Sequence, residues 1–594
     1  MMESFFFRRS MLAGGIALGL SLPSLMMAAG ANVYLQQNLV SNVAGQAAFT
    51  DPNLLDPWGI SLSATSPFWV SNHLGGTSTL YSGNGAITAV VVTIPPGKAS
   101  TGLGRPTGQV QNASTGFILQ NGTKASFIFA TEDGTIQAWN GGTVAQVMVD
   151  NSVAGAVYKG LAINPSATAP LIYAANFNSG KIDVFNSTFS PTTAAGGFTD
   201  PNLPAGFAPF NIWNLNGQLY VTYAKQDANK LLDVAGAGNG FVDVFDFNGN
   251  LLNRLVSNGA LNSPWGVAIA PAGWGAFGGA LLVGNFGNGQ INAFNLTTGS
   301  MLGTLQNAAG AAISIPGLWA IVFGGNGSRS DANTLYFAAG VPDGSTTKSG
   351  LLGSLAPPSA ISFIYNAAGG QSTAVAPGEI VSITGQTVGP APLVSAALPA
   401  TGTIGTTLGT TSVTFNNVPA PVFYTAGSLT SVIVPYEVAG STTASVVLKT
   451  GGQTTAAFSI PVAASIPGVF TSNDGGSGQA VVYNQDGTVN TATNPAAKGT
   501  VIVLYATGEG TTNPPGQDGL ISSSDVLREP VLAVSLTIGG QTAQVLYAGS
   551  APGNVAGVME VEAIVPAGTA SGAAAVVLTV GSAASQANVT VNVK

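Results

Sequence analysis

The chain has 594 residues, enough for two or three domains. Lys and Arg number 16 against 24 Asp and Glu, a net charge of −8; charged residues make up 7% of the chain and hydrophobic residues 45%. A disordered chain would need the opposite balance of charge and hydrophobicity, so disorder is excluded. The 80 Gly and 34 Pro argue against long helices and favour an all-β fold with many tight turns.

The composition also excludes several kinds of site. Without a basic stripe to neutralise phosphates, we expect no nucleic-acid partner. The chain has no cysteine, which excludes disulfides, thiolate metal sites and thiol nucleophiles. Its single histidine, His73, excludes any site that needs two imidazoles.

Residues 1–31 have the pattern of a signal peptide rather than of a folded element. Arg8 and Arg9 precede an apolar run at residues 11–22 that is too short to span a bilayer, and small residues at 29–31 fit a cleavage site. The arginine pair is typical of twin-arginine export, an ordinary Sec signal fits as well, and an uncleaved anchor is a third interpretation. We expect export to the extracellular space, the cell surface or the periplasm, with no transmembrane segment after cleavage.

Two signals alternate through residues 32–356. The first is the start of an apolar strand at a Pro or Gly, and the second is a strand, a short polar turn and another strand. Markers of the first signal are spaced by 49, 53, 50, 55 and 54 residues; they are Trp58, Thr107, Gly160, Phe210, Trp265 and Trp319. Six units of four short strands predict a six-bladed β-propeller. The strand-like residues 33–43 are expected to close the ring by joining the last blade.

After Pro357 and Pro358 aromatic residues become rare, and Ala, Thr, Val, Ser and Gly alternate in short strands between Gly-rich turns. Period-two alternation with a turn every eight to twelve residues is typical of β-sandwiches. The tail is too long for one such domain. We therefore predict two immunoglobulin-like sandwiches, at residues 357–464 and 465–594.

Several strings in residues 32–356 resemble an uncharacterised family of secreted bacterial proteins with propeller-like repeats. They are Tyr158–Ala162, Tyr223–Ala228, Gly240–Asp246, Ser263–Gly266 and Gly284–Gly287. The hairpins are also similar to NHL-type repeats. This resemblance implies a propeller fold without an assigned activity.

The tail resembles a C-terminal module found on many secreted proteins of soil bacteria. The matching strings are Pro377–Val381, Val418–Val422, Pro435–Gly440, Asn484–Thr488, Leu504–Gly510 and Tyr547–Gly553. The resemblance implies a portable, non-catalytic extension that acts as a spacer or attachment module.

In a propeller, the loop before each first strand and the turn between the second and third strands share one face, around the mouth of the central channel. We predict a ligand-binding mouth from the polar residues that the repeats put there, namely His73, Glu132, Asp133, Lys159, Asn176, Lys225, Asp227 and Asn285. Each also has a structural explanation. Asp133 precedes a glycine in a favoured hairpin turn, the asparagines can bond their own turns, and the lysines can pair with nearby aspartates.

Three of the mouth residues, together with Asp56 on the same face, are candidate ligands of Ca²⁺ or another divalent cation, as in six-bladed lactonase-like hydrolases, where the metal activates water. They are Asp56, Glu132, Asn176 and Asn285. The string Asp56-Pro57-Trp58 differs from the Glu-Gly-Pro string of that family. The loop 227–240 is a second candidate for Ca²⁺, but it lacks the required Asp spacing, and we expect it to be mobile over the mouth.

Three functions stay open at this point. The favoured one is an exported, non-enzymatic protein, monomeric, whose channel mouth binds a cell-surface, polysaccharide or protein partner. The second is a divalent-metal-dependent hydrolase or lyase, and the third is a structural component of an envelope or matrix. No catalytic residue is assigned, because the elbow that presents a nucleophilic serine is missing and His73 would be the only base.

Overall fold

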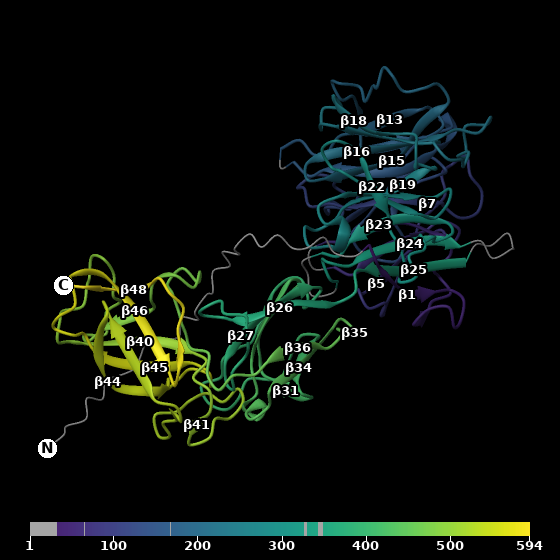
Figure 1. The fold of residues 1–594 in the computed structure, drawn as a ribbon. Helices are drawn as coiled ribbons and strands as arrows, with labels where there is room; N and C mark the ends of the chain where they lie inside the picture. Colours follow the sequence, from purple (N-terminus) through teal and green to yellow (C-terminus); the bar gives the residue numbers. More distant parts are fainter. Residues whose placement is uncertain (1–31, 64–65, 167, 326–329, 342–348) are drawn as a thin grey trace. The chain divides into compact units, whose positions relative to one another are not determined.

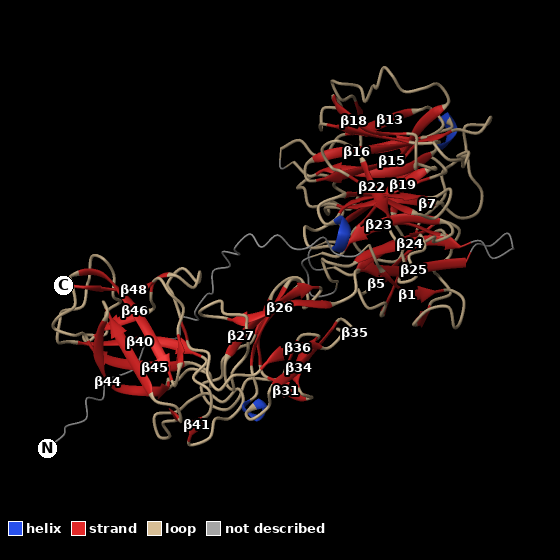
Figure 2. Ribbon diagram, viewed as in Figure 1, coloured by secondary structure: helices blue, strands red, loops and turns tan. Residues whose placement is uncertain are grey.

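The computed structural model describes residues 32–63, 66–166, 168–325, 330–341 and 349–594; the expected signal peptide lies outside them. The chain divides into two compact units, residues 32–358 and 359–594, called here the ring and the tail. Strands dominate both units (Figure 2), and the described helices are three short 3₁₀ turns, η1 (Ser152–Ala154), η2 (Gly275–Phe277) and η3 (Tyr436–Val438). The all-β prediction is confirmed. No helix within these ranges is long and apolar enough to cross a membrane.

The ring contains six sheets, and Figure 1 labels at least one strand of each. Their strands pair antiparallel, except that β2 (Phe49–Thr50) pairs parallel with β1 (Leu35–Ser41). The first three are β3 (Pro57–Ser61), β4 (Phe68–Asn72), β5 (Thr77–Tyr81) and β6 (Ile87–Thr93); β7 (Pro106–Gln111), β8 (Phe127–Thr131), β9 (Thr135–Trp139) and β10 (Gln146–Asp150); and β11 (Tyr158–Asn164), β12 (Leu171–Asn176), β13 (Lys181–Phe185) and β14 (Pro191–Thr192). The fourth and fifth are β15 (Phe207–Leu215), β16 (Gln218–Lys225), β17 (Phe241–Phe245) and β18 (Leu251–Ser257); and β19 (Pro264–Ile269), β20 (Leu281–Asn285), β21 (Ile291–Phe294) and β22 (Met301–Thr304).

The sixth sheet joins the two ends of the ring. Its order is β2 (Phe49–Thr50), β1 (Leu35–Ser41), β25 (Ser349–Ala356), β24 (Leu335–Val341) and β23 (Leu318–Phe323). β1 pairs antiparallel with β25, so the segment predicted to close the ring does so. This pairing covers an edge that would otherwise offer unpaired backbone groups.

The first strands of the six sheets contact one another in cyclic order, from β3 through β7, β11, β15, β19 and β23 back to β3. Glycine permits this close approach. A Cβ on Gly59 would lie 2.4 Å from the Thr107 carbonyl oxygen, and one on Gly108 would lie 2.4 Å from the Leu161 nitrogen. The glycine in the repeated string Pro-x-Gly therefore has a packing cause: the innermost strands meet with no room for a side chain.

The first half of the tail, residues 359–464, consists of two sheets around one core of residues such as Ile383, Val413 and Leu448. One sheet contains β26 (Ala360–Asn366), β27 (Ile380–Gln386), β33 (Leu429–Ile433), β32 (Val422–Ala426) and β28 (Val394–Ser395). The other contains β29 (Thr407–Leu408), β30 (Thr411–Phe415), β34 (Thr443–Thr450), β35 (Gln453–Thr454), β31 (Val418–Ala420) and β36 (Phe458–Pro461).

The second half, residues 465–594, holds one continuous sheet around its own core. Its strands are β37 (Gly468–Val469), β40 (Val501–Thr507), β45 (Met559–Ile564), β44 (Gln541–Ser550), β43 (Val534–Ile538), β46 (Gly572–Val580), β48 (Val589–Val593), β38 (Gly478–Gln479), β39 (Val482–Asn484) and β47 (Ala583–Ala584), with β41 (Thr512–Asn513) and β42 (Glu529–Pro530) forming a separate pair. β44 bonds β43 with its beginning and β45 with the rest, with a register shift between Val545 and Tyr547. Such an irregularity lets one long strand turn a sheet back on itself.

The two halves of the tail share a third core. Ile380 and Ile433 from the first half pack with Phe470 and Val558 from the second. Hydrogen bonds also cross, since the Asn366 amide donates to the Ile466 carbonyl at 2.9 Å. The two halves of the tail therefore form one compact unit rather than two separate domains.

Candidate functional site

One backbone hydrogen bond repeats in all six sheets of the ring and defines its mouth. In five sheets the residue that follows the second strand donates its N–H to the carbonyl before the first strand. In the sixth sheet the donor is Gly340, one position before the end of β24. The donors are His73, Glu132, Phe177, Gln226, Phe286 and Gly340, at 2.8–3.0 Å from the acceptors Asp56, Arg105, Val157, Gly206, Ser263 and Gly317. We call the six donors the mouth ring. Two positions after each acceptor stand Trp58, Thr107, Lys159, Ala208, Trp265 and Trp319. Lys159 thus occupies the position that tryptophan holds in three other sheets.

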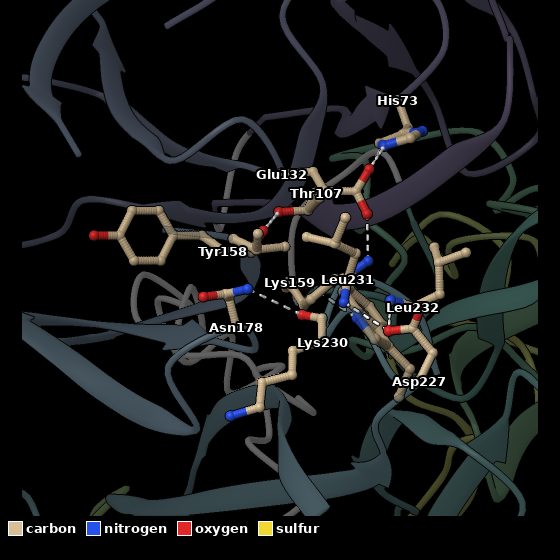
Figure 3. A network of polar contacts seen from close by, with 12 residues as sticks. His73, Thr107, Glu132, Tyr158, Lys159, Asn178, Asp227, Lys230, Leu231 and Leu232 are labelled. Atoms are coloured by element: carbon tan, nitrogen blue, oxygen red, sulfur yellow. Dashed lines mark hydrogen bonds and ion pairs between the residues drawn. The ribbon is translucent and has the colours of Figure 1, made fainter. Parts of the chain in front are cut away.

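Four ionisable side chains meet at this mouth and are called here the central charge network. Figure 3 shows three of them, His73, Glu132 and Lys159; the fourth is Asp56. His73 Nε2 lies 2.7 Å from Glu132 Oε2, and its Nδ1 lies 3.2 Å from Asp56 Oδ2. The Lys159 ammonium bonds the other oxygen of Glu132. The Glu132 side chain is 18% exposed, whereas His73, Asp56 and Lys159 are buried. The central charge network holds two potential cations, His73 and Lys159, and two carboxylates, so its charges balance when the imidazole is protonated.

The electrostatics of the central charge network favour the protonated His73 imidazole. Burial by itself lowers the pKa of His73, but hydrogen bonds with Asp56 and Glu132 outweigh it and raise the pKa above 6.5. Burial raises the pKa of Glu132, but the Lys159 ammonium and His73 outweigh it and hold that pKa well below its usual range. In its protonated form His73 donates from both nitrogens, to Asp56 and to Glu132.

Aromatic rings pack together inside the ring, against the central charge network. This aromatic plug consists of Trp58, Phe177, Phe210, Trp265, Phe286 and Trp319. Trp58 stacks on His73 at 4.5 Å and on Trp319 at 3.5 Å. The Lys159 ammonium lies 5.4 Å from the Trp58 ring centre and 5.7 Å from that of Phe177. Cation–π attraction thus helps to hold a buried lysine in place.

Asp56 is fixed by backbone strain and close packing. It has a φ of 49°, in the left-handed region that non-glycine residues rarely adopt. A Cβ on Gly340 would lie 1.7 Å from Asp56 Oδ1, so only glycine fits at this point of the mouth ring. The carboxylate that accepts from His73 is therefore held by an adjacent sheet.

The network offers little to acid–base chemistry. An imidazolium that donates from both nitrogens has no lone pair with which to accept a substrate proton. The Glu132 carboxylate uses each oxygen for a cation of the protein, and its lowered pKa makes it a weak base. The geometry is that of a charge-balanced support for the mouth.

Three other predicted site residues accept hydrogen bonds from the backbone that precedes the first strand of their own sheet. Asp133 accepts from the backbone N–H groups of Gly97 and Arg105. The Asn176 oxygen accepts from Val157 N at 3.2 Å, and the Asn285 oxygen accepts from Asn262 N at 3.1 Å. Asn176 also accepts within its own turn, from Ser179 N at 3.3 Å, which is the contact that the sequence suggested for it.

Of the remaining two, Lys225 ends β16, and Asp227 lies on the loop between β16 and β17. Lys225 is exposed, and Asp227 Oδ1 accepts from the backbone of Leu231 at 2.8 Å and Leu232 at 3.1 Å (Figure 3). Gln226, at the start of the loop, donates to the Phe177 carbonyl at 2.6 Å, which bonds this end of the loop to the third sheet. The oxygen of Asp227 that would serve Ca²⁺ closes a turn.

The four metal candidates do not form a ligand set. The side-chain oxygens of Asn176 and Asn285 bond backbone N–H groups, and both Glu132 oxygens bond His73 and Lys159. In the described part of the chain, no group of three or more His, Asp or Glu side chains is arranged to hold a metal ion. The residues present do not fit a divalent cation.

Sequence reasoning missed a second polar cluster, in the fourth sheet. Arg254 bonds Asp200 and approaches Asp243, with its Nε 3.6 Å from Asp243 Oδ1, and stacks over Phe241. Burial and the charge of Asp200 raise the pKa of Asp243 to about 7. Asp243 alternates with core residues along β17, and this pattern in the sequence could have indicated a buried carboxylate. The aromatic plug was also missed, although aromatic residues recur at the first-strand markers.

Relatives of the chain carry no assigned activity. The uncharacterised protein R648 of Acanthamoeba polyphaga mimivirus is 32% identical over 339 residues, which are 55% of this chain and 80% of that protein. The uncharacterised protein L690 of the same virus is 31% identical, over 55% of this chain and 86% of that protein. These relatives are viral, whereas the sequence strings pointed to bacterial proteins. No family model matches the chain.

Solved structures similar to the chain include virginiamycin B lyase from Staphylococcus aureus with quinupristin, at 14% identity and a TM-score of 0.30, over 54% of this chain and 99% of that one. A glucose dehydrogenase matches at 11% identity and a TM-score of 0.35, also over 54% and 99%. Neither likeness is close enough to transfer an activity.

Proposed function

The chain belongs to the family of the uncharacterised mimivirus protein R648, and from its geometry we propose a non-enzymatic binding protein whose ring mouth holds a protein partner. One observation carries this proposal: the charged groups at the mouth neutralise one another inside the network of Asp56, His73, Glu132 and Lys159. A site built for catalysis keeps a base or nucleophile free to react, with its pKa near the working pH. This network is instead a rigid floor for recognition.

The residues that face solvent lie beside that floor, on the third and fourth sheets. We call them the rim patch; they are Lys181, Lys225, Lys230, Leu231, Leu232 and Val234. The loop that carries most of them is fixed beside the plug, since Gln226 bonds the Phe177 carbonyl and Val234 N bonds the Lys225 carbonyl at 2.8 Å. A loop that is ordered in advance loses little entropy on binding.

The chemistry of the rim patch favours a protein over a polysaccharide. Leu231 and Leu232 are 46% and 59% exposed, and clustered exposed aliphatic side chains mark protein interaction sites. Sugar rings are recognised by stacking on exposed aromatic faces. All 7 Trp and 13 Tyr of the chain lie in the described residues, and each is buried or half-buried. The three lysines favour a partner segment with acidic residues around an apolar anchor.

The finer features of the architecture belong to the same proposal. The closed contacts among six first strands support a six-bladed propeller, and the two-sheet arrangement of residues 359–464 supports an immunoglobulin-like module. We further propose that the tail is a spacer or attachment module and that the chain is exported, by the Sec or the twin-arginine route. A structural matrix role would instead use the tail for self-association and leave the rim patch dispensable.

The test uses the full chain with a photo-cross-linking residue at position 231, or at 302 as a control. Leu302 is 50% exposed on β22 and follows Met301, which is 48% exposed, so this pair matches the loop leucines in exposure. We expect a protein cross-link from position 231, and at least a tenfold weaker Kd for Leu231→Asp with Leu232→Asp but not for Met301→Asp with Leu302→Asp. Equal cross-linking at both positions would refute the proposal. So would a turnover activity that His73→Gln abolishes.

A further inference from the structure

Two glutamates are enclosed at the junction between the halves of the tail. Glu379 lies just before β27 of the first half and is 0% exposed. Glu509 lies just after β40 of the second half and is 4% exposed. Glutamate is almost never fully buried unless it is paired, so two of them at one junction require an explanation.

The protein gives these carboxyls few partners. Glu379 Oε2 accepts from Ala376 N at 2.6 Å, whereas Glu379 Oε1 and Glu509 Oε2 are buried without a hydrogen-bond partner. No Lys or Arg of the described chain forms an ion pair with either. Elements packed nearby bring mainly further acids; the ionisable groups there are Tyr436 and Glu437 of η3, Asp518 and Arg528 of the loop 511–530, and Glu560 of β45.

The environment favours the protonated form of both groups. Burial and, to a smaller extent, the charge of Glu509 raise the pKa of Glu379 to about 8, against the hydrogen bond from Ala376 and the nearby Asn366 amide. Burial raises the pKa of Glu509 to about 7. Arg528 is a nearby cation, but its Nε donates to the Pro515 carbonyl at 3.1 Å and so serves its own loop.

The chain is packed too closely here to hydrate a charge. Ile380 N donates to Thr507 Oγ1 at 2.9 Å, so the residue after Glu379 is bonded across the junction to the residue two positions before Glu509. A Cβ on Gly510 would lie 2.0 Å from the Ala464 carbonyl oxygen, and one on Gly508 would lie 1.9 Å from that of Ile466. The segment that connects the halves therefore lies directly on the turn that carries Glu509. An ionised Glu509 would have to displace it to reach water.

We propose that this junction is a pH-operated latch, closed while Glu379 and Glu509 hold their protons and opened when both carboxyls lose them. Opening exposes the third core, including Phe470 and Ile380, and converts a compact tail into two halves joined by a flexible segment. For an extracellular protein, such a latch would tie the reach of the tail to the pH of its surroundings. The inference concerns the tail alone and stands apart from the binding function proposed for the ring.

The experiment is amide hydrogen exchange of the full chain, followed by mass spectrometry, at pH 6 and at pH 9. Wild type is compared at each pH with Glu379→Gln plus Glu509→Gln, so the intrinsic pH dependence of exchange cancels. We expect equal exchange of residues 464–470 at pH 6, and at least tenfold faster exchange in wild type at pH 9. The matched control is Asp525→Asn plus Glu529→Gln, which removes two exposed acids and should behave as wild type.

Equal exchange of wild type and the double glutamine variant at pH 9 would overturn the latch. Infrared spectroscopy gives a second readout that survives if the double variant fails to fold. Wild type at pH 6 should show the carbonyl stretch of protonated carboxyl groups, weaker in either single variant and lost from wild type by pH 9. Its absence at pH 6 would refute the proposal independently.

Discussion

His73 Nε2 lies 2.7 Å from Glu132 Oε2, and these two residues hold the same position in adjacent sheets of the ring. The bond follows from the repeat. Each of the two residues comes directly after a second strand, and the ring places equivalent positions of adjacent sheets next to one another. A histidine and a glutamate that are 59 positions apart in the sequence become neighbours through symmetry. The charge network is thus a local departure from a repeated frame whose other members are mostly apolar.

The first prediction uses the fact that His73 is the only histidine in the chain. Its imidazole gives a single histidine signal in a ¹³C-resolved NMR spectrum of the full protein, so its pKa can be measured without assignment. We expect a pKa above 6.5, because two carboxylates stabilise the imidazolium. Glu132→Gln should lower it. Asp133→Asn changes a neighbouring charge that bonds Gly97 instead, and should leave it nearly unchanged. An unshifted pKa in wild type would contradict the network.

The second prediction concerns Lys159. Lys159→Met keeps the length of the side chain but leaves Glu132 buried beside fewer cations, so the ring should lose about 3–5 kcal/mol of unfolding free energy. Urea unfolding followed by tryptophan fluorescence measures this, because all seven tryptophans lie in the ring. The exposed Lys225→Met is the matched control and should change stability by less than about 0.5 kcal/mol.

A double variant separates the ion pair from packing. Lys159→Met with Glu132→Gln removes both charges, so its loss should be smaller than the sum of the two single losses. Additive losses would mean that the two residues act independently.

Much of the fold was predictable because its signals are local. Alternation, turn residues and the fifty-residue period predicted the strands, and the closing role of residues 33–43 was confirmed by the pairing of β1 with β25. The register inside the repeat was less accessible. Gly160 was used as a marker, whereas the repeated hydrogen bond aligns Lys159 with Trp58. Only that alignment shows that a lysine replaces a tryptophan at the channel.

The sequence predicted which residues lie near the mouth, but not which of them bond one another. His73, Glu132 and Lys159 were expected near one mouth, and the structure brings them together with Asp56. Composition could not tell that the side-chain oxygens of Asn176 and Asn285 accept from the backbone before a first strand, since this depends on how distant segments pack together. The buried pair Glu379 and Glu509 was missed for a related reason. Each follows or precedes a glycine in a turn-like string, which locally indicates an exposed loop, and only long-range packing encloses it.

The third prediction tests how Asp56 is held. Gly340→Ala would add a Cβ at 1.7 Å from Asp56 Oδ1, so the carboxylate or β24 must move. We expect a loss of about 1–3 kcal/mol in the ring. The histidine signal should also shift, because His73 would lose the geometry of one partner. Gly273→Ala is the control: no heavy atom lies within 4 Å of its added Cβ, and it should not lower stability. A Gly340→Ala variant with an unmoved histidine signal would contradict the assigned role of Asp56.

The last prediction is the pH dependence of the stability of the tail, and its sign is opposite to the usual one for carboxylates. The pKa values of Glu379 and Glu509 are about 8 and about 7 in the folded tail, against 4.5 ordinarily, so above pH 4.5 the unfolded chain binds fewer protons than the folded one. Unfolding free energy must then fall as pH rises from about 4.5 to about 8, with a slope of up to about 1.4 kcal/mol per pH unit for each group.

Urea unfolding of the full chain, read by pulsed hydrogen exchange of β40, isolates the tail from the tryptophan signal of the ring. Glu379→Gln should flatten the pH dependence and stabilise the tail at pH 8, because a neutral amide replaces a group that must otherwise take up a proton. Glu529→Gln, on an exposed strand, should leave the slope unchanged. A tail whose stability rises between pH 5 and pH 8 would show that both carboxylates are ionised and compensated in the folded state, because only then does unfolding become harder as protons are removed.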